Sequence, residues 1–142
     1  MPQIATAPAR PAHLTLVAVI LLAVYAALTA DYLNDRFDLL PDAPYLLAKL
    51  PYGALWAQVS WSLTVWLGLA GALFLAWRDD AAVLILFAAF VTGLAAMIKV
   101  SLSLPLSVLT AMPLAALIPA AVLAPLLGWL YARAMKRAGV LI

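Results

Sequence analysis

The sequence predicts an all-α membrane protein in which four transmembrane helices form a bundle, with a short amphipathic segment between helices 1 and 2. Of its 142 residues, 68% are hydrophobic and only 10% are charged. An ordinary soluble domain has roughly 45–50% apolar and about 25% charged residues, so this chain lacks the side chains that would cover a water-facing surface. It has room for four apolar stretches of about 20 residues, the length that crosses a hydrocarbon core of roughly 30 Å.

The N-terminal part predicts a flexible cytoplasmic tail over residues 1–12 and a first span over about residues 14–32. Three prolines among small residues disfavour a helix in the tail. The apolar segment that follows is longer than the usual core of about 7–15 residues in a secretory signal, and it lacks a good cleavage site. We therefore expect it to remain as a transmembrane helix within a single domain over residues 13–142.

The segment between the first two spans, residues 31–51, is polar and carries four aspartates, at positions 31, 35, 38 and 42. Apolar residues between the aspartates predict a short helix in the headgroup region, broken by Pro41 and Pro44. The aspartate spacing is helical and lacks the Asp-x-Asp-x-Asp-Gly pattern of a calcium loop. The acidic residues are therefore predicted to form a solvated face and not a metal site.

Three further spans are predicted over about residues 52–77, 81–99 and 106–132. Pro51 is tolerated at the start of the second span, where its nitrogen needs no partner within the helix. Only Arg78, Asp79 and Asp80 separate spans 2 and 3, which predicts two antiparallel neighbours. The fourth span contains or adjoins prolines at positions 105, 113, 119 and 125, so we expect a kink or interruption unless neighbours satisfy the freed carbonyl groups.

The distribution of lysine and arginine predicts that both chain termini are cytoplasmic. With four spans, five cationic residues fall on the side of the termini and three on the side of the aspartate-rich loop. Cytoplasmic segments of membrane proteins retain the positive residues, which places the turn at 78–80 inside and the loop at 31–51 outside.

Small residues in the second span predict close helix packing. Gly68 and Ala72 form a small-xxx-small pair, and Gly71 lies beside them in the same stretch. Such residues let two helices approach closely, which is a main source of attraction where lipid removes the hydrophobic drive. A substrate path lined by glycine is the alternative interpretation, and packing is favoured over it.

A polar stripe is predicted on the first half of the second span, formed by Gln58, Trp61, Ser62 and Trp66. Gln58 and Ser62 share one helix face, and the two indole N–H groups need acceptors in the apolar region. The stripe is interpreted as a set of hydrogen bonds between helices, with a ligand site as the alternative. An ion pair between Asp31 and Lys99, which end spans 1 and 3 on the same side, is a further hypothesis.

The residue types exclude several classes of function. There is no cysteine and no glutamate, and the single histidine, His13, has no partner at ligand spacing. None of the common nucleophile, phosphate-loop or metalloprotease motifs occurs, so neither an enzyme nor a protein with a metal or another cofactor is expected. The few dispersed cations provide no surface that would bind nucleic acid.

The segment from Leu50 to about Ala96 resembles a family of small four-span bacterial inner-membrane proteins that often carry the label "sugar transporter". The matching features are "LP" at 50–51, "TVWLGLAGALFLAWR" at 64–78 and "AAVLILFAAFVTGLA" at 81–95. The resemblance implies a multi-pass protein of the bacterial inner membrane. Such proteins usually have a basic turn after the second span, whereas this chain has Arg78 followed by two aspartates.

Two functional hypotheses follow from the sequence. The first is a non-enzymatic accessory or scaffold protein in the lipid bilayer, packing through the second span as a homo-oligomer or as a subunit of a larger membrane complex. The second is a small transporter or ligand-binding membrane module whose site is the polar stripe of the second span. A polar cavity at the stripe would favour the second hypothesis, and burial of the stripe against a helix would favour the first.

Overall fold

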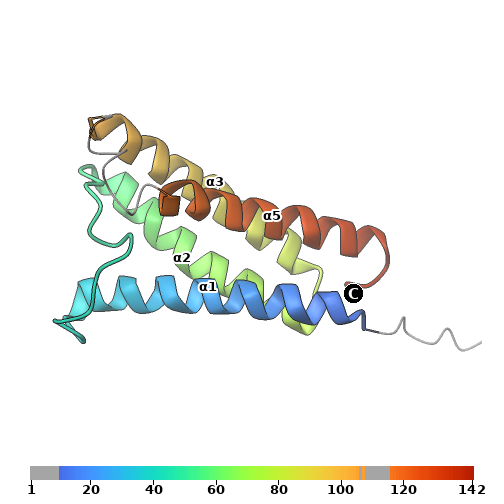
Figure 1. Ribbon diagram of the computed structural model, residues 1–142. Coiled ribbons are helices and arrows are strands. Elements are labelled where there is room, and N and C mark those ends of the chain that lie inside the picture. Colours follow the sequence, from blue (N-terminus) through green and yellow to red (C-terminus); the bar gives the residue numbers. More distant parts are fainter. Residues whose placement is uncertain (1–9, 106, 108–115) are drawn as a thin grey trace, which may run out of the picture.

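The computed structural model describes residues 10–105, 107 and 116–142, and these residues contain four long helices packed as a bundle (Figure 1). The helices are α1 (Ala12–Phe37), α2 (Leu55–Trp77), α3 (Ala81–Ser103) and α5 (Leu117–Arg137). No strand occurs in the described part of the chain. The predicted all-α bundle is therefore confirmed.

Each of the four helices is long and apolar enough to cross a membrane. They contain 26, 23, 23 and 21 residues, and at 1.5 Å per residue each reaches about 30 Å or more. Large apolar side chains cover their outer surfaces, including Leu84, Trp77 and Leu127. That surface suits lipid and not water, and the protein is a four-span, multi-pass membrane protein.

The predicted helix between the first two spans is not formed. Instead α1 continues to Phe37, and residues 38–54 form a loop of turns. Asp38 ends α1 in the left-handed conformation, with φ of 51°. Pro41 and Pro44 follow shortly after Asp38, and each lacks the backbone N–H that a continuing helix would need. The aspartate at position 35, expected in a separate amphipathic helix, thus belongs to the last turns of the first span.

The fourth helix is displaced along the chain from its predicted bounds. It begins at Leu117 and ends at Arg137, beyond the predicted end at residue 132. Pro119 occupies its first turn, where no intrahelical N–H bond is needed, and Pro125 is buried in its interior. Pro113, one of the four prolines for which a kink or interruption was predicted, lies outside the described residues. The same is true of residues 1–9 of the flexible tail predicted over residues 1–12, whereas Ala12 already belongs to α1.

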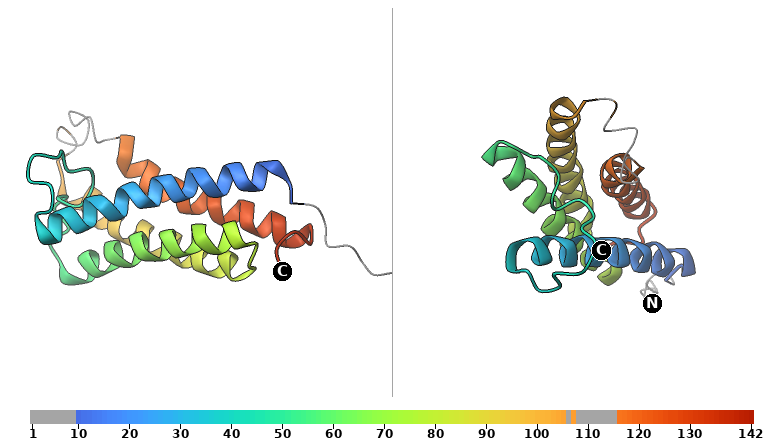
Figure 2. Two further views of the ribbon diagram at one scale, coloured as in Figure 1. Left: turned by 90° about the horizontal axis from the view of Figure 1, so that it is seen from below. Right: turned by 60° about the vertical axis from the view of Figure 1, so that its left-hand side comes forward.

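The helices pack mainly in chain order, α1 on α2, α2 on α3 and α3 on α5, whereas α1 and α5 make few contacts with each other. Figure 2 shows the loop of residues 38–54 at one end of the bundle and the C-terminal residues at the other. The bundle therefore has two distinct ends. The loop end holds residues 38–54, and the opposite end holds the start of α1, the α2–α3 turn and the C-terminal residues.

The C-terminal residues form hydrogen bonds with the α2–α3 turn at the end of the bundle opposite the loop. The backbone N–H of Ile142 donates to the Arg78 carbonyl at 2.8 Å, and the N–H of Asp80 donates to the Ile142 carbonyl at 3.2 Å. Lys136 of α5 forms an ion pair with Asp80 at 2.6 Å. The tight α2–α3 turn is therefore tied to the end of α5, and the exposed ion pair adds little to the stability.

Two threonine hydroxyls link α2 to α3 within the bundle. The Oγ1 atoms of Thr64 and Thr92 lie 2.9 Å apart, and each is also bonded to a carbonyl one turn earlier in its own helix. Thr64 is completely buried, so its hydroxyl has no access to water. This pair is a polar contact between α2 and α3 that is formed by residues outside the predicted stripe.

Replacing Thr64 with valine should destabilise the bundle only slightly, by about 0.5–1 kcal/mol. Valine preserves the shape, and hydrogen bonds between membrane helices are worth about 0.6 kcal/mol on average. Thr15→Val on the exposed face of α1 is the matched control and should leave the stability unchanged. Unfolding by SDS in mixed micelles measures both, and a loss above about 2 kcal/mol for Thr64→Val would contradict this account.

Candidate functional site

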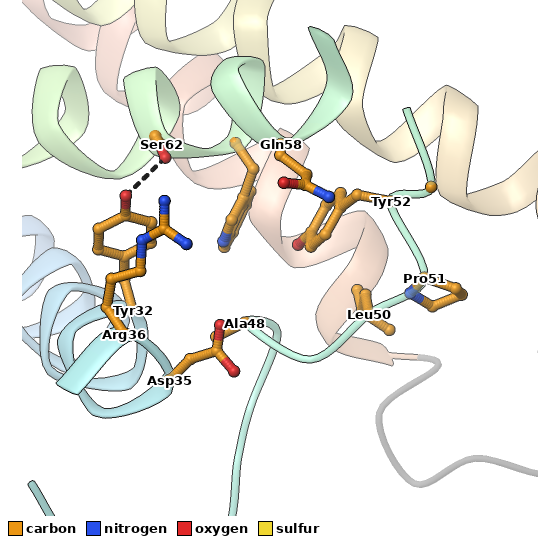
Figure 3. Close-up of a pocket in the computed structure, with 11 residues that line it drawn as sticks. Tyr32, Asp35, Arg36, Ala48, Leu50, Pro51, Tyr52, Gln58 and Ser62 are labelled. Atoms are coloured by element: carbon orange, nitrogen blue, oxygen red, sulfur yellow. Dashed lines mark hydrogen bonds between the residues drawn. The ribbon is translucent and has the colours of Figure 1, made fainter. Parts of the chain in front are cut away.

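A polar cavity of about 440 Å³ lies at the loop end of the bundle (Figure 3). Three segments enclose it: the last turns of α1, the end of the loop and the first turns of α2. The lining residues are Tyr32, Asp35 and Arg36 from α1, Ala48 and residues 50–53 from the loop, and Gln58, Trp61 and Ser62 from α2. Its volume is within the range of about 300–1,000 Å³ that is common for small-molecule sites.

The carboxylate of Asp31 holds the loop that forms one wall of the cavity. It accepts hydrogen bonds from the backbone N–H groups of Leu46, Leu47 and Ala48, each at 2.8 Å. Asp31 is only 7% exposed, and ionised acceptors form stronger bonds than neutral ones. One side chain near the end of α1 therefore fixes three consecutive loop residues.

Asn34, one turn further along α1, holds an earlier part of the same loop. Its side-chain Oδ1 accepts from the N–H of Leu40 at 2.6 Å, and its Nδ2 donates to the Leu40 carbonyl at 3.1 Å. The two contacts satisfy both backbone groups of Leu40 in a segment without regular structure. The loop is thus attached to α1 at two points.

Tyr52 connects the loop wall to α2. Its ring stacks on that of Trp61 at 5.9 Å between centroids and 18° between planes. Its hydroxyl donates to the Leu47 carbonyl at 2.8 Å. Burial, and then the negative charges of Asp31 and Asp35, raise the pKa of Tyr52. The hydroxyl therefore remains protonated at neutral pH and keeps this hydrogen bond.

The structure divides the predicted polar stripe of α2 between two environments. Gln58, Trp61 and Ser62 line the cavity, whereas Trp66 is 46% exposed on the outer surface. Ser62 donates to the hydroxyl of Tyr32 at 2.8 Å, so the stripe also supplies a hydrogen bond between α1 and α2. The same turns of α2 thus provide a hydrogen bond between helices and one wall of a cavity, which are the two interpretations that the sequence left open.

In the described part of the chain, the indole N–H of Trp61 has no hydrogen-bond partner. Trp61 is 2% exposed, and its Nε1 atom is buried too deeply to contact a molecule in the cavity. A buried donor left unpaired costs about 1–3 kcal/mol. Trp61 therefore contributes its ring, and not its N–H group, to the lining of the cavity.

The small residues of α2 pack against other helices of the same chain. A side chain added at Gly68 would overlap the ring of Tyr25 from α1, and one added at Gly71 would lie 2.7 Å from Leu86 of α3. Ala72 is completely buried. These residues bring α1 and α3 close to α2 within one molecule, so they are not available for packing against a second one.

The structure gives Asp31 and Lys99 separate surroundings. Both oxygens of Asp31 are bonded to the loop, and among the described residues Lys99 forms no ion pair with it. The loop amides replace the cation that the sequence suggested. In the same part of the chain, no group of three histidine or acidic side chains lies close enough to hold a metal ion.

Sequence reasoning missed every part of the cavity outside α2, including the polar residues Tyr32, Asp35, Arg36 and Tyr52. Tyr32 lay at the predicted end of the first span, and Asp35 and Arg36 were assigned to the separate amphipathic segment that was expected to follow it. A signal was present, because Tyr32, Asp35 and Arg36 follow Asp31 at helical spacing without an intervening proline. Tyr52 could not have been found in this way, since its position depends on how Asp31 folds the loop.

Comparisons with protein-family models, curated proteins and solved structures found no match. The resemblance over residues 50–96 therefore identifies no family. What the fold and the sequence share with such proteins is the presence of four candidate membrane-spanning helices.

Proposed function

We propose that the protein is a non-enzymatic, four-span membrane protein that binds a small polar molecule in the cavity at its loop end. The observation that carries this proposal is the convergence of three residues of the α2 stripe, the end of α1 and the anchored loop on one polar cavity. This is the ligand-binding hypothesis suggested by the sequence, with a site that now includes residues of α1.

The accessory or scaffold hypothesis has less support. It depended on Gly68, Gly71 and Ala72 for contacts with another molecule, and these residues contact α1 and α3 of their own chain. The remaining outer surface is apolar, which lipid alone requires. Assembly of the protein with itself or with a larger complex is therefore the alternative hypothesis, and the experiment below distinguishes it from ligand binding.

A binding role is favoured over catalysis by the chemistry of the cavity. Its described lining contains one carboxylate, Asp35, and no histidine, so it lacks the paired acid and base or the activated nucleophile that most hydrolytic mechanisms need. The charge distribution supports a bacterial inner membrane orientation with both termini in the cytoplasm and the cavity facing outward. In this orientation, ligand would arrive from the outer headgroup region.

Native mass spectrometry of protein purified in mild detergent tests the proposal. We expect wild-type protein to retain a non-covalent adduct of defined mass that is absent from Gln58→Trp. Gln58 is exposed at the cavity wall, so tryptophan there fills the cavity without disturbing the core. Trp56→Leu, at an exposed position in the same turns of α2, is the matched control and should keep the adduct. Protein without an adduct but with a stoichiometric protein partner would instead support the scaffold hypothesis.

A further inference from the structure

Two opposite charges face the loop-end cavity without neutralising each other. Asp35 and Arg36 both line it. In the described part of the chain, neither side chain forms an ion pair. In Figure 3 the guanidinium of Arg36 lies beside the ring of Tyr32 and is directed toward α2, whereas the carboxylate of Asp35 is directed toward the loop at Ala48. The cavity thus has a cationic side and an anionic side.

Hydrogen-bond donors collect on the cationic side. The guanidinium of Arg36 offers up to five N–H groups in a fork that matches phosphate oxygens. The hydroxyl of Tyr32 accepts from Ser62 at 2.8 Å, which leaves its own proton free to donate. The guanidinium of Arg36 and the hydroxyl of Tyr32 together suit an anion with several oxygens.

The anionic side suits an ammonium group. Asp35 is a hydrogen-bond acceptor when ionised, and its charge is felt in the cavity because it helps to raise the pKa of Tyr52. The stacked rings of Tyr52 and Trp61 also line the cavity, and they provide an apolar surface against which a short carbon chain can pack. The site lies at the ends of two helices long and apolar enough to cross a membrane, where lipid headgroups are expected in a bilayer.

We propose that the cavity recognises a phosphoethanolamine group, either free or as the headgroup of a phospholipid, with the phosphate at Arg36 and Tyr32 and the ammonium at Asp35. This inference rests on the proposed function and names the class of ligand for that site. Phosphate or ethanolamine alone satisfies only one side of the cavity. A quaternary ammonium headgroup cannot donate a hydrogen bond to Asp35.

Binding measurements on the purified full-length protein test the assignment. In detergent, O-phosphoethanolamine should raise the melting temperature, while inorganic phosphate and ethanolamine at the same concentration should not. In nanodiscs of phosphatidylcholine, added phosphatidylethanolamine should be retained in native mass spectra, and added phosphatidylglycerol should not. Binding in the first assay indicates a free ligand, and binding only in the second indicates a lipid. Absence of binding in both, or equal retention of phosphatidylglycerol, would overturn the inference.

Charge-neutral variants locate the two sides of the site. Arg36→Gln and Asp35→Asn should each weaken binding by about tenfold or more, because each removes one charge-assisted contact. Lys49→Gln and Asp42→Asn change loop charges outside the cavity and should bind as wild type does. Equal affinity of all four variants would overturn the inference. An adduct lost in Gln58→Trp that is not a phosphoethanolamine compound would also overturn it, yet would leave the proposed function standing.

Discussion

Replacing Gly68 with alanine should destabilise the bundle by about 3 kcal/mol or more, since overpacking of a filled core typically costs about 1–3 kcal/mol and sometimes exceeds that range. The added methyl group would overlap the ring of Tyr25. That ring is 1% exposed and has no free space into which it can turn. Relief requires α1 to move away from α2, which separates the two helices that carry most of the cavity. Unfolding by SDS in mixed micelles measures the loss.

Two comparisons show whether the overlap is the cause. In a Tyr25→Ala background, Gly68→Ala should cost less than about 1 kcal/mol, because the atoms that it meets are gone. Gly128→Ala is the matched control on α5, where the added carbon would lie 3.2 Å from the flexible end of Leu21. It should be nearly neutral, since alanine also favours the helix by about 1 kcal/mol. Similar losses at both glycines would contradict the account.

Replacing Asp31 with alanine should release the loop from the end of α1. The N–H groups of Leu46, Leu47 and Ala48 would lose their common acceptor, and each hydrogen bond to a charged group contributes about 1.5–3 kcal/mol. We expect these three amides to exchange with solvent about 100-fold faster, which corresponds to a local opening that is easier by nearly 3 kcal/mol. Hydrogen exchange read by mass spectrometry measures this effect peptide by peptide.

The control for Asp31 is another aspartate of the same region. Asp42→Ala changes an exposed loop residue and should leave the exchange of the three amides unchanged. Asp31→Asn should fall between wild type and alanine, since its amide retains one acceptor oxygen. Protection that survives in Asp31→Ala would show that the carboxylate does not hold the loop.

The sequence predicted the bundle well because the physical rule behind each span is local. Twenty or so apolar residues must form a helix in lipid, wherever their neighbours lie. The small residues of α2 were predicted to pack against another helix, but the sequence could not identify the partner of Gly68. It is Tyr25, more than 40 positions away along the chain, and no spacing within α2 contains that information.

The cavity was predicted only on the side that α2 contributes. Gln58 and Ser62 could be found because one helix face repeats every three to four residues. The positions of Asp35 and Arg36 depended on where α1 ends. The first span was predicted to end near residue 32, where the polar segment begins, whereas α1 continues to Phe37. The loop wall depended on a tertiary contact, the capture of three amides by Asp31, which sequence patterns do not encode.

The pairing of each helix chiefly with the next one along the chain has a consequence for biogenesis. A helix that leaves the translocon finds its main partner already in the bilayer, so assembly can advance without waiting for distant segments. The contact between the first and last helices forms last and is small. We therefore expect local opening of the bundle to begin between α1 and α5.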